Sequence, residues 1–410
     1  MIFGLVGKKL NYSLSKVLHE NLEMQNYELK EVPEDEIRSF FAKRDFNYVN
    51  VTAPYKKIAF DECNVLSETA IKTGVVNTVI NKNGTLYGYN TDYAGMKTAL
   101  TLSGYGFKGK TAVIFGSGAT SDTAKAVLCD LGVKEVLVVS RKGVLNYGNC
   151  DNLSPDVVIN ATPVGTFPDL TGTPYDLTRF KTLPELVFDC VYNPKNTPLI
   201  RRAKSLEIKT ASGLAMLAFQ GVYGEKLYFG NLDDKLVENA LKRLYLASSN
   251  VVLTGMAGAG KTKIAKRISE LTGMPFYDTD ERVKKITGKT PAEIISEKGM
   301  EEFRKAEKEA VKELALKRGA VIALGGGTVL DDENVDLLKG AGKFYFIDRS
   351  ANKLSRKDRP LYKGLSSILK IEAVRKPLYL SISDKVIVNE KTIDDVADEI
   401  IKDYYEDITY

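Results

Sequence analysis

Residues 255–262 constrain the fold of this chain more than any other segment, because they read Gly-Met-Ala-Gly-Ala-Gly-Lys-Thr. The segment follows a short apolar run, residues 250–254, and precedes a helical pattern, as a complete Walker A motif does. In such a loop, backbone N–H groups surround phosphate oxygens, the lysine reaches the β and γ phosphates, and the final hydroxyl binds Mg²⁺. The motif predicts a P-loop α/β domain that binds ATP through Gly258, Ala259, Gly260, Lys261, Thr262 and Lys263.

A second glycine-rich turn, Gly116-Ser117-Gly118, follows the apolar run 111–115 and precedes a helix predicted over residues 123–131. Two glycines permit a tight turn and bring backbone N–H groups close to a pyrophosphate. Ser121 stands where the third glycine of a dinucleotide-binding fingerprint would be, and its small side chain still allows close packing. By itself, this segment is equally consistent with an ordinary turn between a strand and a helix.

The end of the next predicted strand, residues 135–139, adds information about the nucleotide. Ser140, Arg141 and Lys142 follow that strand, whereas an NAD-binding enzyme usually has a carboxylate there for the ribose 2′-hydroxyl. A hydroxyl and two cations suit a 2′-phosphate instead, because an arginine can bind it with two parallel hydrogen bonds. A solvated basic turn is the alternative interpretation.

The chain has 410 residues, which is enough for roughly two to four domains. Strands and helices alternate along it, and this pattern is typical of α/β layers around parallel sheets. A closing helix predicted over residues 233–246 and a short linker at Ser248–Ser249 lie between the two glycine loops. We predict three parts: a substrate-binding lobe over residues 1–97, to which residues 216–246 return, a dinucleotide-binding lobe over 98–215, and a P-loop domain over 249–410.

Composition argues against several functional classes. No stretch approaches the roughly 18 consecutive apolar residues of a membrane helix, and the N-terminus lacks the basic region of a signal peptide. Four widely spaced cysteines argue against a disulfide framework and favour the cytoplasm, while a single histidine, His19, excludes a multi-histidine metal site. Anionic small molecules explain the net charge of +5 as well as nucleic acid does. We predict small-molecule substrates, and neither nucleic-acid nor membrane partners.

Three polar segments of the first lobe are candidates for a functional role. Ser13 and Ser15 stand at the start of a predicted helix, residues 50–56 follow a buried-looking strand, and Asn90-Thr91-Asp92 closes another strand. Loops that follow strands often carry functional residues. Taken singly, however, Ser13 could simply cap its helix, and residues 90–92 could cap the next one.

Taken together, these segments resemble the shikimate dehydrogenase family over about residues 1–246. The matching segments occur in family order: Ser13-Leu14-Ser15, Asn50-Val51-Thr52-Ala53-Pro54-Tyr55-Lys56, Val76-Asn77-Thr78, Asn90-Thr91-Asp92, Ile159-Asn160-Ala161-Thr162-Pro163, and Gly213-Leu214-Ala215-Met216-Leu217 with Gln220. The resemblance implies a bilobed enzyme with a Rossmann-type lobe that reduces 3-dehydroshikimate to shikimate with NADPH.

By this resemblance, Lys56 and Asp92 form the catalytic pair. A ketone that receives a hydride needs a proton for the developing alkoxide, and a lysine held by a carboxylate can relay that proton. The resemblance assigns substrate binding to Ser13, Ser15, Thr52, Asn77, Asp92, Tyr192 and Gln220. It assigns NADP binding to Gly116, Ser117, Gly118, Ala119, Thr120, Ser140, Arg141, Lys142, Thr162 and Gly213.

The sequence departs from the family pattern at four positions. Tyr12 and Lys16 replace a histidine and a proline around the two serines. Ala119 replaces a glycine of the phosphate loop, and Ser212 stands where an acidic or amide residue is common. We expect these departures to affect affinity and specificity, not the class of reaction.

The second half of the chain adds polar elements after its own predicted strands. In Asp278-Thr279-Asp280, two carboxylates two residues apart at a strand end are expected to point to one side. Gly325-Gly326-Gly327 allows a ligand to approach the backbone closely. Arg304 lies on a charged helix, where a surface cation is the alternative interpretation, and Arg359 and Arg375 lie in a basic stretch that could form a mobile lid.

These elements resemble shikimate kinase over about residues 250–405. The resemblance assigns shikimate binding to Asp280, Arg304, Gly326 and Arg375, a contact with ATP phosphates to Arg359, and Mg²⁺ to Thr262 and Asp278. It implies that Asp280 deprotonates the 3-hydroxyl of shikimate, and that the catalytic lysine is Lys261. Between Lys353 and Arg359, the expected lid is several residues shorter than in family members.

The two halves fit one another chemically, because the first would produce the shikimate that the second consumes. The sequence therefore predicts a bifunctional enzyme of consecutive steps toward chorismate and the aromatic amino acids. One alternative is a quinate/shikimate dehydrogenase that uses NAD, fused to a small-molecule kinase. Another is a ligand-sensing protein with inactive sites, against which these intact residues argue: Lys56, Asp92, Lys261, Thr262 and Asp280.

Overall fold

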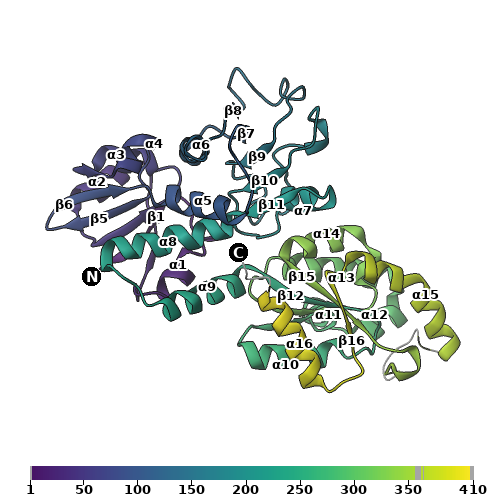
Figure 1. Cartoon of the computed structure of the whole chain (residues 1–410). Coiled ribbons are helices and arrows are strands. Elements are labelled where there is room, and N and C mark those ends of the chain that lie inside the picture. The colour runs from purple at the N-terminus through teal and green to yellow at the C-terminus, as the bar shows by residue number, and fades with distance from the viewer. Residues whose placement is uncertain (1, 356–361, 363, 407–410) are drawn as a thin grey trace. The chain divides into compact units, whose positions relative to one another are not determined.

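The computed structural model describes residues 2–355, 362 and 364–406, and the chain divides into two compact units between Tyr245 and Leu246 (Figure 1). The first unit contains two sheets and the second contains one.

A six-stranded sheet in the order β2-β1-β3-β5-β6-β4 forms the first lobe of the first unit. Its strands are β1 (Phe3–Gly7), β2 (Glu28–Glu31), β3 (Tyr48–Val51), β4 (Val65–Leu66), β5 (Thr78–Lys82) and β6 (Thr85–Tyr89). The helices of this lobe are α1 (Ser15–Glu20), α2 (Ile37–Lys43), α3 (Lys56–Glu62) and α4 (Glu68–Thr73). The sheet is mixed, which differs from the parallel sheets that the alternating pattern predicts. The reason is the two-residue turn Asn83-Gly84, whose positive φ angles favour an antiparallel hairpin of β5 and β6.

The second lobe of this unit is a parallel five-stranded sheet in the order β11-β10-β9-β7-β8. Its strands and helices are β7 (Thr111–Phe115), α6 (Ala119–Asp130), β8 (Glu135–Val139), β9 (Val157–Asn160), the short 3₁₀ helix η1 (Leu177–Arg179), β10 (Leu186–Asp189), α7 (Pro198–Ser205) and β11 (Lys209–Ser212). Helix α6 begins at Ala119, earlier than predicted, because Gly118 is its N-cap and accepts a hydrogen bond from the N–H of Ser121. This is the doubly wound, Rossmann-type arrangement that the sequence predicts.

Two helices, α5 (Thr91–Leu102) and α8 (Gly213–Phe229), connect the two lobes and pack against one another. They approach closely at Gly95, where a Cβ atom would lie 2.5 Å from the carbonyl oxygen of Met216. The far end of α8 packs through Leu227 and Tyr228 onto the buried residues of the first sheet, such as Tyr48. The chain therefore leaves the first lobe through α5 and returns to it through α8.

Helix α9 (Asp234–Ser248) follows α8 and corrects one prediction about the linker. The predicted linker was Ser248–Ser249, but the helix includes Ser248 and strand β12 begins at Asn250. Only Ser249 therefore separates the last helix of the first unit from the first strand of the second.

The second unit is built on a parallel five-stranded sheet in the order β13-β14-β12-β15-β16. Its strands are β12 (Asn250–Thr254), β13 (Phe276–Asp278), β14 (Val321–Ala323), β15 (Gly342–Asp348) and β16 (Lys385–Val388). Its helices are α10 (Lys261–Thr272), α11 (Thr279–Thr287), α12 (Pro291–Lys298), α13 (Met300–Ala315), α14 (Asp332–Ala341), α15 (Leu365–Ile382) and α16 (Ile393–Glu406), with short 3₁₀ helices η2 (Thr328–Leu330) and η3 (Ala351–Lys353). The Walker A loop lies between the central strand β12 and helix α10.

The structure differs from the prediction of a mobile lid in the part of the basic stretch that contains Arg375. Arg375 lies inside helix α15, which is long because Leu365 to Ile382 form one continuous helix that includes Pro377. Arg359 lies outside the described residues.

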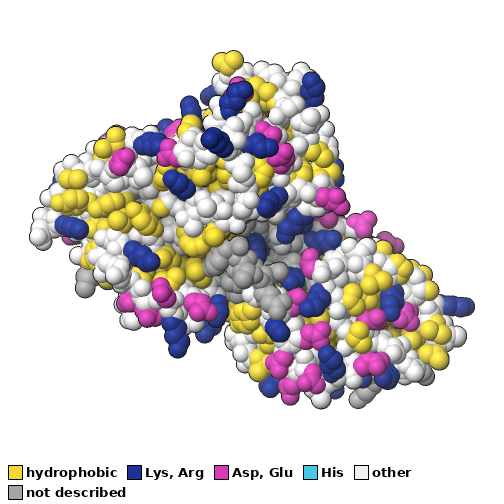
Figure 2. All heavy atoms as spheres, in the orientation of Figure 1, with side chains coloured by type: hydrophobic (Ala, Val, Ile, Leu, Met, Phe, Trp, Pro, Cys, Tyr) yellow, Lys and Arg dark blue, Asp and Glu magenta, His cyan; other side chains and the backbone are white. Residues whose placement is uncertain are grey.

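On the face shown in Figure 2, lysine and arginine side chains are interspersed with carboxylates and with small apolar patches. Among the described residues, no helix combines the length and apolar character needed to cross a bilayer.

Two candidate active sites

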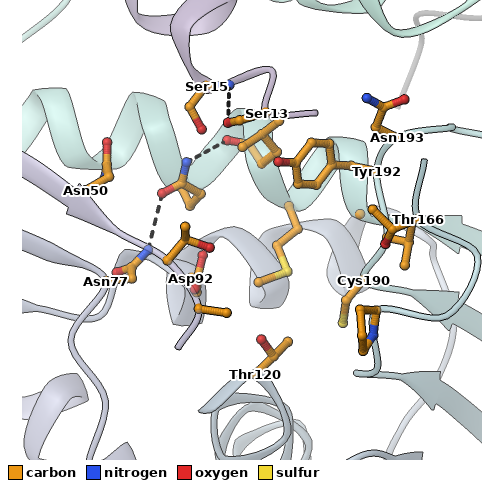
Figure 3. Close-up of a pocket in the computed structure, with 18 of the residues that line it drawn as sticks. Ser13, Ser15, Asn50, Asn77, Asp92, Thr120, Thr166, Cys190, Tyr192 and Asn193 are labelled. Carbon is orange, nitrogen blue, oxygen red and sulfur yellow. Dashed lines mark hydrogen bonds between the residues drawn. The ribbon is translucent and has the colours of Figure 1, made fainter. Parts of the chain in front are cut away.

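A cavity of about 280 Å³ lies in the first unit, lined by residues from both lobes. Its lining includes the predicted catalytic pair and every residue predicted to bind the substrate: Ser13, Ser15, Thr52, Lys56, Asn77, Asp92, Tyr192 and Gln220. Several of these side chains are seen around the cavity in Figure 3. Segments far apart in the sequence therefore meet at one place, as the motifs predict.

Lys56 and Asp92 form an ion pair inside this cavity, with 2.5 Å between Nζ and Oδ2. Lys56 is the first residue of α3, and Asp92 lies in the first turn of α5, whose start is capped by the side chain of Asn90. The two side chains are only 13% and 10% exposed. A shielded pair of this kind is a short, charge-assisted hydrogen bond, and its proton can be exchanged with a bound ligand.

A second polar network orients two amides of the cavity wall. Asn77 Nδ2 donates to Thr91 Oγ1 at 3.0 Å and to Gln220 Oε1 at 3.3 Å, and Thr91 Oγ1 donates to the same Gln220 oxygen at 3.1 Å. All three residues are buried. Because these bonds engage the oxygen of Gln220, the network fixes the orientation of both amide groups in the cavity.

The two serines and Tyr192 form another part of the wall, and the ring of Tyr192 points toward Ser13 (Figure 3). Burial raises the pKa of Tyr192 to about 12, while a hydrogen bond with the Ser13 side chain opposes that increase. The phenol is therefore protonated at neutral pH. Ser13 does not cap helix α1, because Leu14 is the N-cap residue; instead, Ser13 Oγ accepts a hydrogen bond from the N–H of Ser15 at 3.2 Å.

The residues predicted to bind the dinucleotide lie after the carboxyl ends of β7, β8 and β9 or at the start of α8. Thr120, Thr162 and Gly213 line the cavity itself. The others, which do not line it, are Gly116, Ser117, Gly118, Ala119, Ser140, Arg141 and Lys142. The sheet register still brings them together, because β7 pairs with β8 and the N–H of Gly116 donates to the carbonyl of Val139.

Gly116 and Gly213 occupy positions where a side chain would not fit. Gly116 has a φ of +106°, and a Cβ atom there would lie 3.0 Å from the carbonyl oxygen of Ala161. A Cβ atom on Gly213 would lie 2.2 Å from the carbonyl oxygen of Cys190. Both glycines therefore let backbone segments approach one another closely, Gly213 in the wall of the cavity and Gly116 outside it.

The second unit has a separate cavity of about 120 Å³. All four residues predicted to bind the kinase substrate line it: Asp280, Arg304, Gly326 and Arg375. Arg304 lies on α13, Arg375 on α15 and Gly326 directly after β14, so the cavity collects residues from widely separated elements. The position of Arg304 in the cavity wall favours substrate binding over the surface-cation interpretation.

The prediction that Asp278 and Asp280 point to one side of a strand end is wrong. Asp278 is the last residue of β13 and the N-cap of α11, whereas Asp280 already lies in the first turn of that helix. Asp278 Oδ1 accepts a hydrogen bond from the N–H of Asp280 at 2.9 Å. The two carboxylates therefore face different groups: Asp278 contacts the Walker A loop, and Asp280 lines the substrate cavity.

Two glycines allow close approaches to the backbone in this cavity. A Cβ atom on Gly327 would lie 2.2 Å from an Nη atom of Arg304, and a Cβ atom on Gly326 would lie 2.9 Å from the backbone nitrogen of Ala257. Arg304 also pairs with Glu307, one turn further along α13, which is only 1% exposed. Arg375 donates to the carbonyl of Gly326 at 2.9 Å.

The Walker A loop has its lysine folded back onto its own backbone. Lys261 Nζ donates to the carbonyls of Gly255 at 2.8 Å and Met256 at 2.9 Å. Thr262 Oγ1 donates to Asp278 Oδ2 at 2.8 Å, so a hydroxyl and a carboxylate lie side by side. Oxygen ligands of this kind suit Mg²⁺, which usually takes few protein ligands and completes its shell with phosphates and water. No cluster of three or more histidine, cysteine or acidic residues suited to a metal occurs in the described part of the chain.

Residues 5–79 match the family model of the shikimate dehydrogenase substrate-binding domain, and residues 257–405 match the model of shikimate kinase. A shikimate dehydrogenase (NADP⁺) from Clostridium beijerinckii is 30% identical over 257 residues, which cover 58% of this chain and 95% of that protein. The chain belongs to the shikimate dehydrogenase family.

Solved structures of shikimate dehydrogenases agree with this assignment. One from Peptoclostridium difficile has a TM-score of 0.56 at 30% identity, covering 60% of this chain and 98% of that one. Another, from Thermus thermophilus in complex with NADP(H) and shikimate, has a TM-score of 0.52 at 30% identity. The match covers 60% of this chain and 100% of that one. With its shikimate dehydrogenase and shikimate kinase parts, the chain is a bifunctional enzyme of shikimate metabolism.

Several residues of the shikimate dehydrogenase site were missed by sequence reasoning. Thr91, Thr166, Cys190 and Asn193 are examples, and Asn50 lines the cavity while accepting a hydrogen bond from Tyr27. Thr91 and Asn50 stood inside recognised motifs, so their position after a strand was an available signal. Nothing local to Asn193 indicated its contacts.

In the shikimate kinase part, Glu307 was missed. It accepts hydrogen bonds from Arg304 and from Thr328 Oγ1, the latter at 2.8 Å. Its spacing of three residues from Arg304 on a predicted helix would have placed both on one face.

Proposed function

We propose that this enzyme reduces 3-dehydroshikimate to shikimate with NADPH and phosphorylates the 3-hydroxyl of shikimate with ATP·Mg²⁺. The observation that carries the first reaction is the Lys56–Asp92 pair, 2.5 Å apart in a cavity whose wall includes the dinucleotide lobe. The four predicted shikimate ligands around the second cavity support the second reaction.

Lys56 donates a proton to the oxygen of the substrate as the ketone becomes an alcohol, and Asp92 holds the lysine in place. Ser13, Ser15 and Tyr192 offer hydroxyl groups to the substrate carboxylate. Thr52, Asn77 and Gln220 bind the ring hydroxyls, with amides whose orientation their own network fixes. NADPH supplies the hydride when it is bound.

The residues of the dinucleotide lobe fit NADP(H). The turn at Gly116 has no room for a side chain, and α6 presents its N-terminus, which favours a pyrophosphate. The exposed cations Arg141 and Lys142 follow β8, where no carboxylate is present for a ribose 2′-hydroxyl. The relative from C. beijerinckii is named for NADP⁺, which agrees with this choice over NAD.

In the kinase site, Arg304 and Arg375 pair with the shikimate carboxylate, and Gly326 forms part of the wall beside the ring. Asp280 accepts the proton of the attacking hydroxyl. Lys261 moves from backbone carbonyls to phosphate oxygens, while Thr262 and Asp278 hold Mg²⁺. ATP supplies the phosphoryl group when it is bound. Arg359 is proposed to contact its phosphates, together with the loop residues Gly258, Ala259, Gly260 and Lys263.

One experiment tests both reactions: purified full-length protein is incubated with 3-dehydroshikimate, NADPH and ATP·Mg²⁺, and shikimate and its 3-phosphate are followed over time. We expect NADPH oxidation first and then conversion of shikimate to the phosphate. Activity on quinate with NAD in place of this would favour the alternative dehydrogenase. Absence of either product would contradict the corresponding half of the proposal.

We also propose that the first unit consists of one lobe over residues 1–97 and another over 98–215, and that residues 249–410 form the kinase domain. Helix α5 crosses the boundary between the two lobes. A cytoplasmic location belongs to it as well, supported by four cysteines that are all free thiols.

A further inference from the structure

The segment between β10 and α7 is fixed at both ends to the dinucleotide lobe. The carboxylate of Asp189, the last residue of β10, accepts hydrogen bonds from Asn160 Nδ2 at 2.9 Å and from Thr197 Oγ1 at 2.6 Å. Asn160 ends the neighbouring strand β9, and Thr197 caps α7. Asp189 therefore ties the start of the segment to its end and to the adjacent strand.

The middle of the same segment reaches the other lobe. Asn193 Nδ2 donates to the carbonyl oxygen of Tyr12 at 2.9 Å, across 181 positions in the sequence. The backbone of Asn193 is held from the opposite direction, because its carbonyl accepts the N–H of Phe167 at 2.8 Å. Asn193 is only 4% exposed, so water does not compete readily for this contact.

The turn that receives this contact carries the two serines of the substrate site. Tyr12, Ser13 and Ser15 all line the cavity. The helix that follows, α1, has six residues and no side-chain hydrogen bond at its N-cap. Within the turn, the N–H of Ser13 donates to the carbonyl of Leu10 at 2.9 Å. A short, uncapped helix start contributes little to its own position, so external contacts decide where the serines lie.

We propose that Asn193 is a positioning residue for the substrate carboxylate: by holding the Tyr12 carbonyl, it keeps Ser13 and Ser15 at the correct distance from Tyr192 and the dinucleotide lobe. This inference rests on the proposed dehydrogenase function. It predicts that loss of the Asn193 side chain weakens substrate binding much more than dinucleotide binding. A residue that only stabilises the fold would affect both.

The test compares Asn193→Ala with a matched control, Asn196→Ala, in the full chain. Asn196 lies on the same segment, but its side chain accepts a hydrogen bond from Lys204 and does not line the cavity. Shikimate oxidation with NADP⁺ is measured, with kinase activity as an internal check. For Asn193→Ala we expect the KM for shikimate to rise roughly three- to tenfold, the range expected for one buried hydrogen bond. The KM for NADP⁺ should stay within about twofold, and Asn196→Ala should change neither value.

A double-mutant cycle with Ser13→Ala shows whether the contact acts through the serine turn. If it does, adding Asn193→Ala to the Ser13→Ala enzyme should raise the KM for shikimate by less than about twofold, because coupled residues are not additive. Asn193→Asp keeps the size of the side chain but places an acceptor opposite the Tyr12 carbonyl. It should therefore raise the KM for shikimate at least as much as Asn193→Ala does. This variant replaces Asn193→Ala in the test if the alanine variant does not fold.

Two results would overturn the inference: equal increases in both KM values, or fully additive effects of Asn193→Ala and Ser13→Ala. Failure of the proposed function is a different outcome, because the unmodified enzyme would then not oxidise shikimate at all.

Discussion

The two candidate sites hold their key cations in different ways. In the dehydrogenase cavity, Lys56 is paired with a carboxylate at 2.5 Å and is largely shielded from solvent. In the kinase unit, Lys261 and Arg375 donate instead to neutral backbone carbonyls. All these hydrogen bonds have a charged donor, but only Lys56 also has an oppositely charged partner. The added attraction between the two charges makes the Lys56 contact harder to replace, whereas the other cations yield more easily to a phosphate or a carboxylate.

The difference matches the chemistry of each site. A carbonyl substrate brings no charge to the reacting atom, so the dehydrogenase needs a proton donor that is already oriented. ATP and shikimate bring several negative charges, so the kinase needs cations that can leave their partners. Arg304 is intermediate, because Glu307 holds it while the cavity remains open beside it.

The largest expected effects come from removing the two lysines. Lys56→Ala should lower dehydrogenase kcat by roughly 10²–10⁴-fold, the usual contribution of a proton donor, and leave kinase activity unchanged. Lys261→Ala should have the reverse effect. Both rates are measured on each full-length variant.

Neighbouring lysines provide matched controls for this pair. Lys57, which forms an exposed ion pair with Asp122, and Lys266, which lies over the ring of Phe276, should tolerate alanine in both assays. Dehydrogenase activity above a tenth of the unmodified rate in Lys56→Ala would exclude a proton-relay role. Loss of both activities in a folded single variant would show that the units depend on each other.

Arg141→Ala tests whether the dehydrogenase also contains a cation that binds a phosphate of its nucleotide. Arg141 is exposed, and its loss should weaken NADPH binding by about ten- to a hundredfold, equivalent to about 1.5–3 kcal/mol, with little change for NADH. Dissociation constants for both nucleotides are compared with those of Arg179→Ala, which removes a surface arginine paired with Asp151 in the same lobe. Equal weakening for NADPH and NADH would show that Arg141 does not contact the 2′-phosphate.

Gly327→Ala tests how closely Arg304 must approach the backbone. The added Cβ atom would lie 2.2 Å from the guanidinium, so the arginine must move. Because only the end of a flexible side chain has to shift, we expect the position of the guanidinium to change more than the stability of the fold. We expect a roughly tenfold higher kinase KM for shikimate, with dehydrogenase kinetics unchanged. Gly364→Ala is the control, because no atom lies within 4 Å of the Cβ position there. Similar KM values for the two variants would mean that Arg304 does not bind the substrate from this position.

The smallest effect on turnover is expected for Asp189→Asn, whose signature is instead a change in stability with pH. Burial raises the pKa of Asp189 from 3.8 to about 6, although three hydrogen bonds oppose the increase. The folded chain therefore binds this proton more tightly than the unfolded chain, so stability from this group is greatest below about pH 4 and falls as the pH rises to about 6.

The measurement is the temperature at which dehydrogenase activity is lost, compared for the unmodified enzyme and Asp189→Asn between pH 4.5 and 7.5. As the pH rises to about 6, the inactivation temperature of the unmodified enzyme should fall by a few degrees relative to that of the variant. Above about pH 6, the difference between the two temperatures should stay constant. A difference that does not change with pH would mean that Asp189 is ionised throughout.

Much of the fold could be predicted from local patterns. The strands at residues 111–115, 135–139 and 250–254 have the predicted bounds, because each is a short apolar run that ends in a distinctive loop. The motifs also identified which residues line each cavity. Motif order is sufficient for that purpose because loops at the carboxyl ends of parallel strands share one edge of a sheet.

Other features depended on contacts that local patterns do not encode. The sequence predicts Asp280 at the end of a strand, but the side chain of Asp278 caps a helix that already includes Asp280. Part of the expected lid is helix α15, whose interior Pro377 reads as a helix breaker in sequence. The bond between Asn193 and Tyr12 joins positions 181 residues apart and leaves no periodic signal.

The return of the chain through α8 has a consequence for how such an enzyme can be assembled in evolution. Because the first lobe is completed only by residues that follow the second lobe, neither lobe can be exchanged as one uninterrupted stretch of gene without breaking the other. Once α9 has ended, however, both lobes are complete, and a second coding region can be appended there while every contact of the dehydrogenase is kept. The order in which the chain visits its lobes thus makes the end of α9 a point where gene fusion carries little structural cost.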